Sequence, residues 1–321
     1  MVGITSHRSW AALLGMAAGV TALAMAGSAA QAAMLASDNA SNYTGSTWPG
    51  AANSGGTSAS TVYSPTGGGT GFGAWTVNVQ NNQNPPYAGT FFGNNASVNV
   101  SSSGAYFGLY ANGAVTTTTP NEIPRVDAMR AFENAGGTGL GTLRAGQAFN
   151  VGFEIQTGNY GIGDNAGVTT GVSLDTITAG TSTPVFTLAF HQDSANNYAL
   201  VTTITDASGS TSYEAPTNAT ALTEPQIEAG INVSFALGNS GAYALTLAPA
   251  TGNTALSSPL TYSGTVSGAI NGADIFDAST NANAQFNNLS ITTAAVPEPA
   301  TIGLFVAAGA GLLLVRRRRS A

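Results

Sequence analysis

Few side chains of this chain could carry out covalent chemistry. It contains no cysteine and no lysine, which excludes a thiol nucleophile, a thiolate metal site and a lysine Schiff base. Between residues 33 and 295 the one histidine is His191, so a serine–histidine–aspartate site would have to recruit it. His191 alternates with Leu188 and Phe190 along its predicted strand. An exposed structural role is therefore favoured over a general base.

A glycoside hydrolase on a jelly-roll fold needs two carboxylates that flank the scissile bond. Glu154 stands alone on its predicted strand, and Asp164 and Asp175 lie in or next to predicted loops. No carboxylate pair is evident. The sequence therefore favours a non-catalytic protein and leaves a glycoside hydrolase as the second alternative.

Three short stretches are rich in the side-chain oxygens that Ca²⁺ accepts as ligands. They are residues 161–167 with Asp164 and Asn165, residues 191–197, and residues 271–279 with Asp274 and Asp277. None of them has the spacing of an EF-hand, so solvated turns are the simpler interpretation and no metal ligand is assigned. We expect no cofactor, with Ca²⁺ as the one candidate.

Two of these loops also carry side chains suited to a carbohydrate ligand. Aromatic rings can stack on a sugar, and amide and carboxylate groups can hydrogen-bond its hydroxyls. The candidates are Tyr160 and Tyr198 as stacking platforms, with Asp164, Asp193 and Asn197 as hydrogen-bond partners. A lectin-like carbohydrate-binding module is therefore the first alternative to a protein without a ligand site.

The charge distribution limits the partners of the body of the chain. Only 7% of all residues are charged, and the stretch 33–295 carries fourteen acids against three arginines, a net charge of −11. Nucleic acid and anionic lipid both need a basic surface, so neither is expected as a partner. Arg125, Arg130 and Arg144 are expected to pair with the surplus acids; binding a carboxylate-bearing sugar is the alternative.

The elements that must position these side chains are predicted to be strands. Residues 147–156 alternate between apolar and polar or glycine positions, so one face is expected to be buried and one wet. Similar runs, each ended by Gly, Asn, Pro or Asp, occupy residues 74–80, 96–100, 105–111, 168–174, 184–191, 197–205, 231–238, 241–248, 259–266 and 284–293. Without a βαβ rhythm, they predict an all-β fold: an antiparallel β-sandwich domain over 74–295, preceded by a loop-rich lead over 33–73 with one short strand near Tyr63.

Three local features refine this prediction. The glycines and asparagine of residues 238–241 suit a hairpin turn. Phe286 is out of phase with Leu289, so we expect a β-bulge near Asn287–Asn288. Residues 122–134 fit a helix and a strand almost equally well, and the sequence does not separate the two.

The N-terminal 32 residues have the order of a secretory signal peptide. Arg8 precedes an apolar run from Trp10 to Ala26, and Ala30 and Ala32 fit the −3 and −1 positions of a signal-peptidase site. We therefore expect a signal helix that is removed after Ala32 on export.

The C-terminus is expected to be a stop-transfer element. The apolar run 300–315 would form a helix about 24 Å long, short of the roughly 30 Å hydrocarbon core. Arg316, Arg317, Arg318 and Arg319 follow it and would hold this end in the cytoplasm, with the body outside. The run thus predicts a single transmembrane helix in the inner membrane.

Val296, Pro297, Glu298 and Pro299 stand just before this helix, in an extended stretch that a protease could grip. The order of Val-Pro-Glu-Pro box, short apolar helix and arginine cluster over 296–321 resembles a PEP-CTERM sorting signal. The resemblance implies an exosortase-type processing enzyme as partner, a transient stay in the inner membrane and an association with exopolysaccharide. The mature protein would then reach the cell surface or the extracellular space.

Residues 70–293 resemble concanavalin-A-like or laminin-G-like jelly rolls in strand rhythm and in the placement of aromatic residues. The leading hypothesis is a non-catalytic surface or matrix protein that is sorted by its tail and works with exopolysaccharide.

Overall fold

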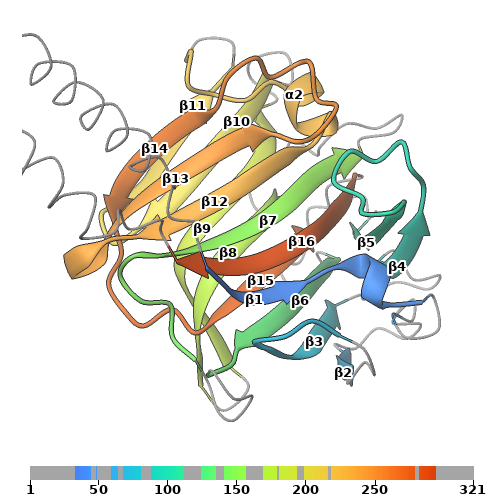
Figure 1. Ribbon diagram of the computed structural model, residues 1–321. Helices are drawn as coiled ribbons and strands as arrows, with labels where there is room; N and C mark the ends of the chain where they lie inside the picture. The colour runs from blue at the N-terminus through green and yellow to red at the C-terminus, as the bar shows by residue number, and fades with distance from the viewer. Residues whose placement is uncertain are drawn as a thin grey trace, which may run out of the picture. The chain divides into compact units, whose positions relative to one another are not determined.

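Two antiparallel sheets pack face to face in the computed structural model (Figure 1). The model describes residues 33–44, 48, 59–63, 68–80, 88–111, 124–134, 141–156, 169–178, 181–193, 199–215, 218–278 and 282–293. Sheet I has the order β14 (Leu260–Thr265), β13 (Ala242–Pro249), β12 (Ile231–Leu237), β7 (Gln147–Gln156), β16 (Asn283–Thr293), β5 (Ala105–Ala111) and β4 (Ala88–Asn94), and β1 (Met34–Asp38) also pairs with β16. Sheet II has the order β11 (Gly209–Glu214), β10 (Ala199–Asp206), β9 (Thr181–Asp193), β8 (Thr169–Thr178), β15 (Gly272–Ala278), β6 (Arg125–Phe132), β3 (Phe72–Gln80) and β2 (Ala59–Tyr63). The prediction of an antiparallel β-sandwich is confirmed for this part of the chain.

Aromatic side chains from the two sheets meet in the core. The ring centroids of Phe153 in β7 and Phe190 in β9 lie 5.7 Å apart, and those of Phe186 in β9 and Phe235 in β12 lie 4.7 Å apart. All four rings are almost fully buried. This interdigitation follows from the period-two alternation of the strands, which sends every second side chain inward.

Strand β16 contains the predicted bulge. Its register against β7 shifts between Asn287 and Ser290, and Asn288 adopts a left-handed conformation with φ 56°. The shift lets Phe286 and Leu289 both point into the core despite their odd spacing. Beyond the bulge, β16 pairs with β1 instead of β5.

The structure resolves the ambiguity at residues 122–134 in favour of a strand, β6. The predicted turn at 238–241 joins β12 to β13 through the short 3-10 helix η3 (Asn239–Gly241). A second 3-10 helix, η1 (Ala40–Asn42), follows β1, and the α-helix α2 (Glu224–Glu228) precedes β12.

One strand prediction is wrong and four strands were not predicted. Residues 96–100 form turns, although Val98 and Val100 are buried against Tyr106 and Ala250 on the outer face of sheet I. The unpredicted strands are β1, β4, β11 and β15. The stretch 33–73, expected to be loop-rich, contributes β1 as well as β2 near Tyr63.

The expected signal peptide 1–32, with Ala30 and Ala32, and the tail 296–321 lie outside the described residues. Among the residues that are described, no helix is long and apolar enough to cross a membrane.

Candidate functional site

The side chains expected to bind sugar cannot be placed. Tyr160, Asp164, Asn197 and Tyr198 lie outside the part of the chain that the structure describes, and only the backbone of Asp193, the last residue of β9, lies within it. These residues stay a prediction.

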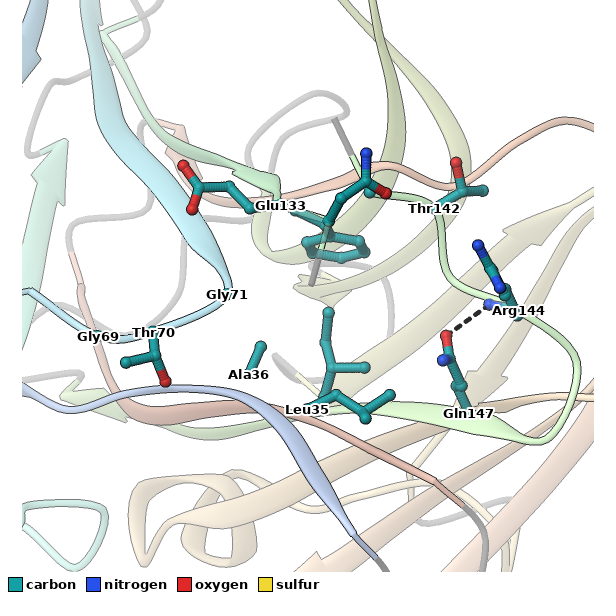
Figure 2. Close-up of a pocket in the computed structure, with 13 residues that line it drawn as sticks. Leu35, Ala36, Gly69, Thr70, Gly71, Glu133, Thr142, Arg144 and Gln147 are labelled. Atoms are coloured by element: carbon teal, nitrogen blue, oxygen red, sulfur yellow. Dashed lines mark hydrogen bonds between the residues drawn. The ribbon is translucent and has the colours of Figure 1, made fainter. Parts of the chain in front are cut away.

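A cleft of about 650 Å³ opens at the end of the sandwich where β6 ends and β7 begins. Its lining residues come from β1, the segment before β3, the connection from β6 to β7, and β16: Leu35, Ala36, Gly69, Thr70, Gly71, Phe132, Glu133, Asn134, Gly141, Thr142, Arg144, Gln147 and Ile291. Phe132, Ala36 and Ile291 are buried and give the cleft an apolar base. Figure 2 shows Arg144 and Gln147 on one side of the cleft and Thr70 and Gly71 on the other.

Arg144 is the cation of this cleft. Its backbone N–H donates to Oε1 of Gln147 over 2.8 Å, which fixes the chain at the start of β7. Its guanidinium is exposed and forms no ion pair with any residue that the structure describes. Glu133 also lines the cleft, so the polar rim offers an anionic acceptor and a cationic donor over the same apolar base.

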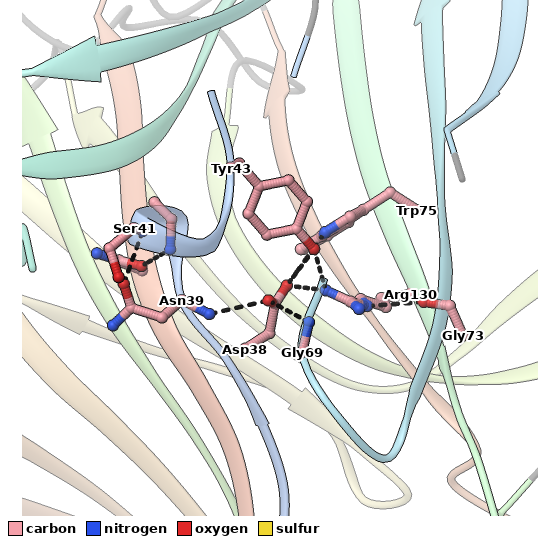
Figure 3. A network of polar contacts seen from close by, with 10 residues as sticks. Asp38, Asn39, Ser41, Tyr43, Gly69, Gly73, Trp75 and Arg130 are labelled. Carbon is pink, nitrogen blue, oxygen red and sulfur yellow. Dashed lines mark hydrogen bonds and ion pairs between the residues drawn. The ribbon is translucent and has the colours of Figure 1, made fainter. Parts of the chain in front are cut away.

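Arg130 is used in the interior instead. It forms a buried ion pair with Asp38, whose carboxylate also accepts hydrogen bonds from the Tyr43 hydroxyl over 2.9 Å and from Trp75 Nε1 over 3.3 Å (Figure 3). The guanidinium lies 4.9 Å from the ring centroid of Trp75 and donates to the carbonyl of Gly73 over 2.9 Å. Asp38 belongs to β1 of sheet I, and Arg130 belongs to β6 of sheet II. The network therefore connects the two sheets.

Arg125 pairs with Asp127 on the face of sheet II that points away from sheet I. Its Nη2 lies 2.6 Å from Asp127 Oδ1, and its guanidinium lies 5.1 Å from the ring centroid of Phe276. The default expectation of pairing with acids therefore holds for Arg125 and Arg130, whereas Arg144 pairs with no acid in the described part of the chain.

The structure also reveals a carboxyl pair that sequence analysis missed. Asp274, expected in an oxygen-rich loop, lies in the centre of β15 and within hydrogen-bonding reach of Asp127 in β6. Burial and the negative charges of Asp127 and Asp175 raise the pKa of Asp274 well above its usual range, more than Arg125 lowers it. The raised pKa favours the neutral form of the Asp274 carboxyl inside the sheet.

Asp175, Asp277 and His191, which the sequence also offered for chemistry, lie within strands of sheet II. Asp175 lies within β8 and not in a loop, and it accepts a hydrogen bond of 2.6 Å from the Ser173 hydroxyl. Asp277, the second acid considered for Ca²⁺ in 271–279, is fully buried in β15. His191 is half-buried in β9, which pairs with a strand on each side. No group of three or more His, Asp or Glu side chains suited to a metal occurs among the described residues.

No family model matches the chain, and no curated protein matches it. Similar solved structures include the CBM2 module of the evolved Dit of Lactobacillus casei BL23 phage J-1, with 18% identity, a TM-score of 0.35, and 60% of this chain and 78% of that chain covered. An alginate lyase from Pseudomonas aeruginosa has 11% identity and a TM-score of 0.36, with 63% of this chain and 85% of that chain covered. The ligand-binding domain of botulinum neurotoxin serotype D, in complex with N-acetylneuraminic acid, has 12% identity and a TM-score of 0.33, with 70% and 49% covered. No conclusion about function follows from likenesses of this size.

Proposed function

We propose that the body of this protein is a non-catalytic carbohydrate-binding β-sandwich and that the cleft around Arg144 is its sugar-binding site. The observation that carries the proposal is the composition of this cleft. It combines an apolar lining, in which Leu35 is exposed, with amide, hydroxyl, carboxylate and guanidinium groups at its rim.

The binding energy expected from such a site is small. Each neutral hydrogen bond contributes about 1 kcal/mol net, and a charged donor such as Arg144 contributes about 1.5–3 kcal/mol. A single site is therefore expected to bind an oligosaccharide with a Kd in roughly the millimolar to high-micromolar range. A polymer that engages several copies of the protein would be retained more strongly.

Hydrolysis of a sugar is less well supported than binding. The carboxyls of Asp127 and Asp274 lie within hydrogen-bonding reach of each other. The carboxyls of glycosidases stand about 5–9.5 Å apart, because the scissile bond lies between them. The two carboxyls therefore lie closer together than acid–base hydrolysis of a glycosidic bond requires.

The proposal is tested by affinity electrophoresis of the full chain in gels that contain neutral or uronate-containing polysaccharides. Wild type should be retarded by at least one of them, and Arg144→Gln should be retarded at least tenfold more weakly. Ser212→Ala, on the exposed edge strand β11, is the control and should behave as wild type. If no polysaccharide retards wild type, the proposal fails; if Arg144→Gln behaves as wild type, this cleft is not the site.

We also propose that the protein is exported and then sorted through a PEP-CTERM-type route, on the basis of the residues at its two ends. N-terminal sequencing of exported protein should find a start after Ala32 or within two residues of it, and a start at Met1 would contradict this. Replacing Arg316–Arg319 with Ser should let the tail pass fully across the membrane or insert at the wrong place, because these four positive charges are what stops transfer of the chain there. Normal processing of that variant, judged from its intact mass and location, would show that the arginines do not hold the chain.

A further inference from the structure

A second, smaller pocket lies at the opposite end of β7 from Arg144, on the outer face of sheet I. It has a volume of about 240 Å³ and lies between the turns after β4, the helix α2, and the strands β7 and β16. Its lining is mostly polar and rich in oxygen: Asn95, Ser97, Val98, Tyr106, Glu154, Ile155, Gln156, Glu228 and Gln285. We call it the Glu154 pocket.

The Glu154 pocket contains two carboxylates and no cation. Glu154 is 7% exposed, and its Oε2 accepts a hydrogen bond of 2.9 Å from the backbone N–H of Asn99. Glu228 comes from α2, and its negative charge acts on Glu154. None of the three arginines between residues 33 and 295 lines the pocket. Burial raises the pKa of Glu154 to about 7, as expected for a carboxyl without a nearby counter-charge.

Gln285 adds an independent observation. Its side chain is 1% exposed, and its Nε2 donates to Oε1 of Gln156 over 2.9 Å. Its own Oε1 is buried and has no hydrogen-bond partner. Buried acceptors are nearly always satisfied in folded proteins, so an orphaned carbonyl oxygen in the lining of an acidic pocket indicates a missing electropositive partner.

We propose that the Glu154 pocket is a binding site for a divalent cation, with Ca²⁺ as the ion that fits best, held by Glu154, Glu228 and Oε1 of Gln285. Ca²⁺ takes six to eight oxygen ligands in irregular geometry and accepts carboxylates, amide carbonyls, hydroxyls and waters together. The two carboxylates neutralise the ion, and the amide oxygen gains the partner that it lacks. The three proposed ligands are not part of the stretches 161–167, 191–197 and 271–279 in which the sequence suggested Ca²⁺.

The bound ion would tie three separate parts of the chain together. Glu154 lies in β7, Gln285 lies in β16, and Glu228 ends the short helix α2, whose five residues are too few to be stable alone. Asn99, in the turns after β4, already hydrogen-bonds to Glu154 and, through its Nδ2, to the carbonyl of Ala229 over 2.9 Å. Binding should therefore stabilise this end of sheet I.

The test is a calcium titration of the full chain after treatment with EDTA, followed by isothermal calorimetry and by the midpoint of thermal unfolding. We expect one site with a Kd of about 10⁻⁴–10⁻³ M, the range of extracellular calcium modules. At a hundredfold excess over Kd, the midpoint should rise by about 5–10 °C. No heat and no shift up to 10⁻¹ M CaCl₂, roughly a hundred times the weakest expected Kd, would overturn the proposal.

Three variants locate the ion. Glu154→Gln keeps the size of the side chain and the acceptor for Asn99, and Glu228→Gln keeps the size of an exposed side chain while it removes the charge. Each should weaken calcium binding at least tenfold. Glu224→Gln removes the same charge from the same helix outside the pocket, and it should bind as wild type. If calcium binds Glu154→Gln and Glu228→Gln as tightly as wild type, the ion lies elsewhere and the proposal is wrong.

Discussion

The buried ion pair between Asp38 and Arg130 should be a major determinant of the stability of the sandwich. Asp38→Asn keeps the size of the side chain but removes its charge. Arg130, whose side chain is 2% exposed, would then lack the carboxylate that it contacts directly. The variant would also weaken the hydrogen bonds that Tyr43 and Trp75 donate to Asp38 Oδ2.

The expected cost of Asp38→Asn is about 3–5 kcal/mol, the cost of removing one partner from a buried charge pair. A domain of ordinary stability has about 5–15 kcal/mol in total, so the variant should lose a large share of it. At about 2–4 °C per kcal/mol for a domain of this size, the midpoint of thermal unfolding should fall by about 6–20 °C.

Asp127→Asn is the matched comparison, because it removes the partner of an arginine on the same strand. The side chain of Arg125 is 40% exposed and stays solvated without Asp127, and the Asn side chain keeps a hydrogen-bonding group beside Asp274, so the expected cost is about 0–1 kcal/mol. Urea denaturation followed by circular dichroism measures both variants against wild type. An Asp38→Asn cost below about 1 kcal/mol, or equal costs for the two variants, would refute the assignment of Asp38 to a buried, structural ion pair.

Two further predictions concern sheet II. A Cβ at Gly171 of β8 would overlap the carbonyl oxygen of Leu188, so Gly171→Ala should cost about 1–3 kcal/mol in urea denaturation, while Gly73→Ala, with only ordinary contacts, should cost less than half as much. Folding raises the pKa of Asp274, so the folded state binds this proton more tightly and wild-type stability should fall as pH rises above about 4 through the folded pKa. Asp274→Asn should lose this fall and exceed wild type in stability at pH 8; the same pH dependence in both proteins would contradict a raised pKa of Asp274.

The sequence predicted strands best where alternation is strict and turn residues follow at once. The predicted bounds 105–111 and 147–156 are those of β5 and β7. The bulge in β16 was also predictable, because Phe286 and Leu289 cannot share a face of a regular strand and both are large enough to require burial.

Alternation is a poor guide where a segment is buried without pairing as a strand, or pairs as a strand despite a polar sequence. Val98 and Val100 alternate and are buried, but they lie in turns that cover the outer face of sheet I. Asp274 and Asp277 gave β15 the composition of a solvated loop, although β15 is a central strand buried on both faces. Alternation of apolar residues indicates which side chains are buried. It does not indicate which backbone groups form hydrogen bonds between strands.

The candidate sites were less predictable than the fold. The cleft around Arg144 brings Leu35 of β1 together with Ile291 of β16, and the Glu154 pocket joins β7, α2 and β16. No local sequence motif predicts that these residues lie together, because their proximity depends on the order of strands in sheet I. Glu154 looked isolated in sequence because its neighbours in space, Glu228 and Gln285, lie far along the chain.

Only three arginines and no lysine occur between residues 33 and 295, so the surroundings of each arginine indicate its role. Arg130 compensates Asp38 inside the sandwich, and Arg125 compensates Asp127 beside Asp274. Arg130 is therefore needed to bury an acid, and Arg125 is already engaged by Asp127. Arg144 has no such role in the described structure and stands at the rim of a cleft. In a body with a net charge of −11, an exposed arginine that pairs with no described acid is a place where an anionic group of a sugar would meet attraction instead of repulsion.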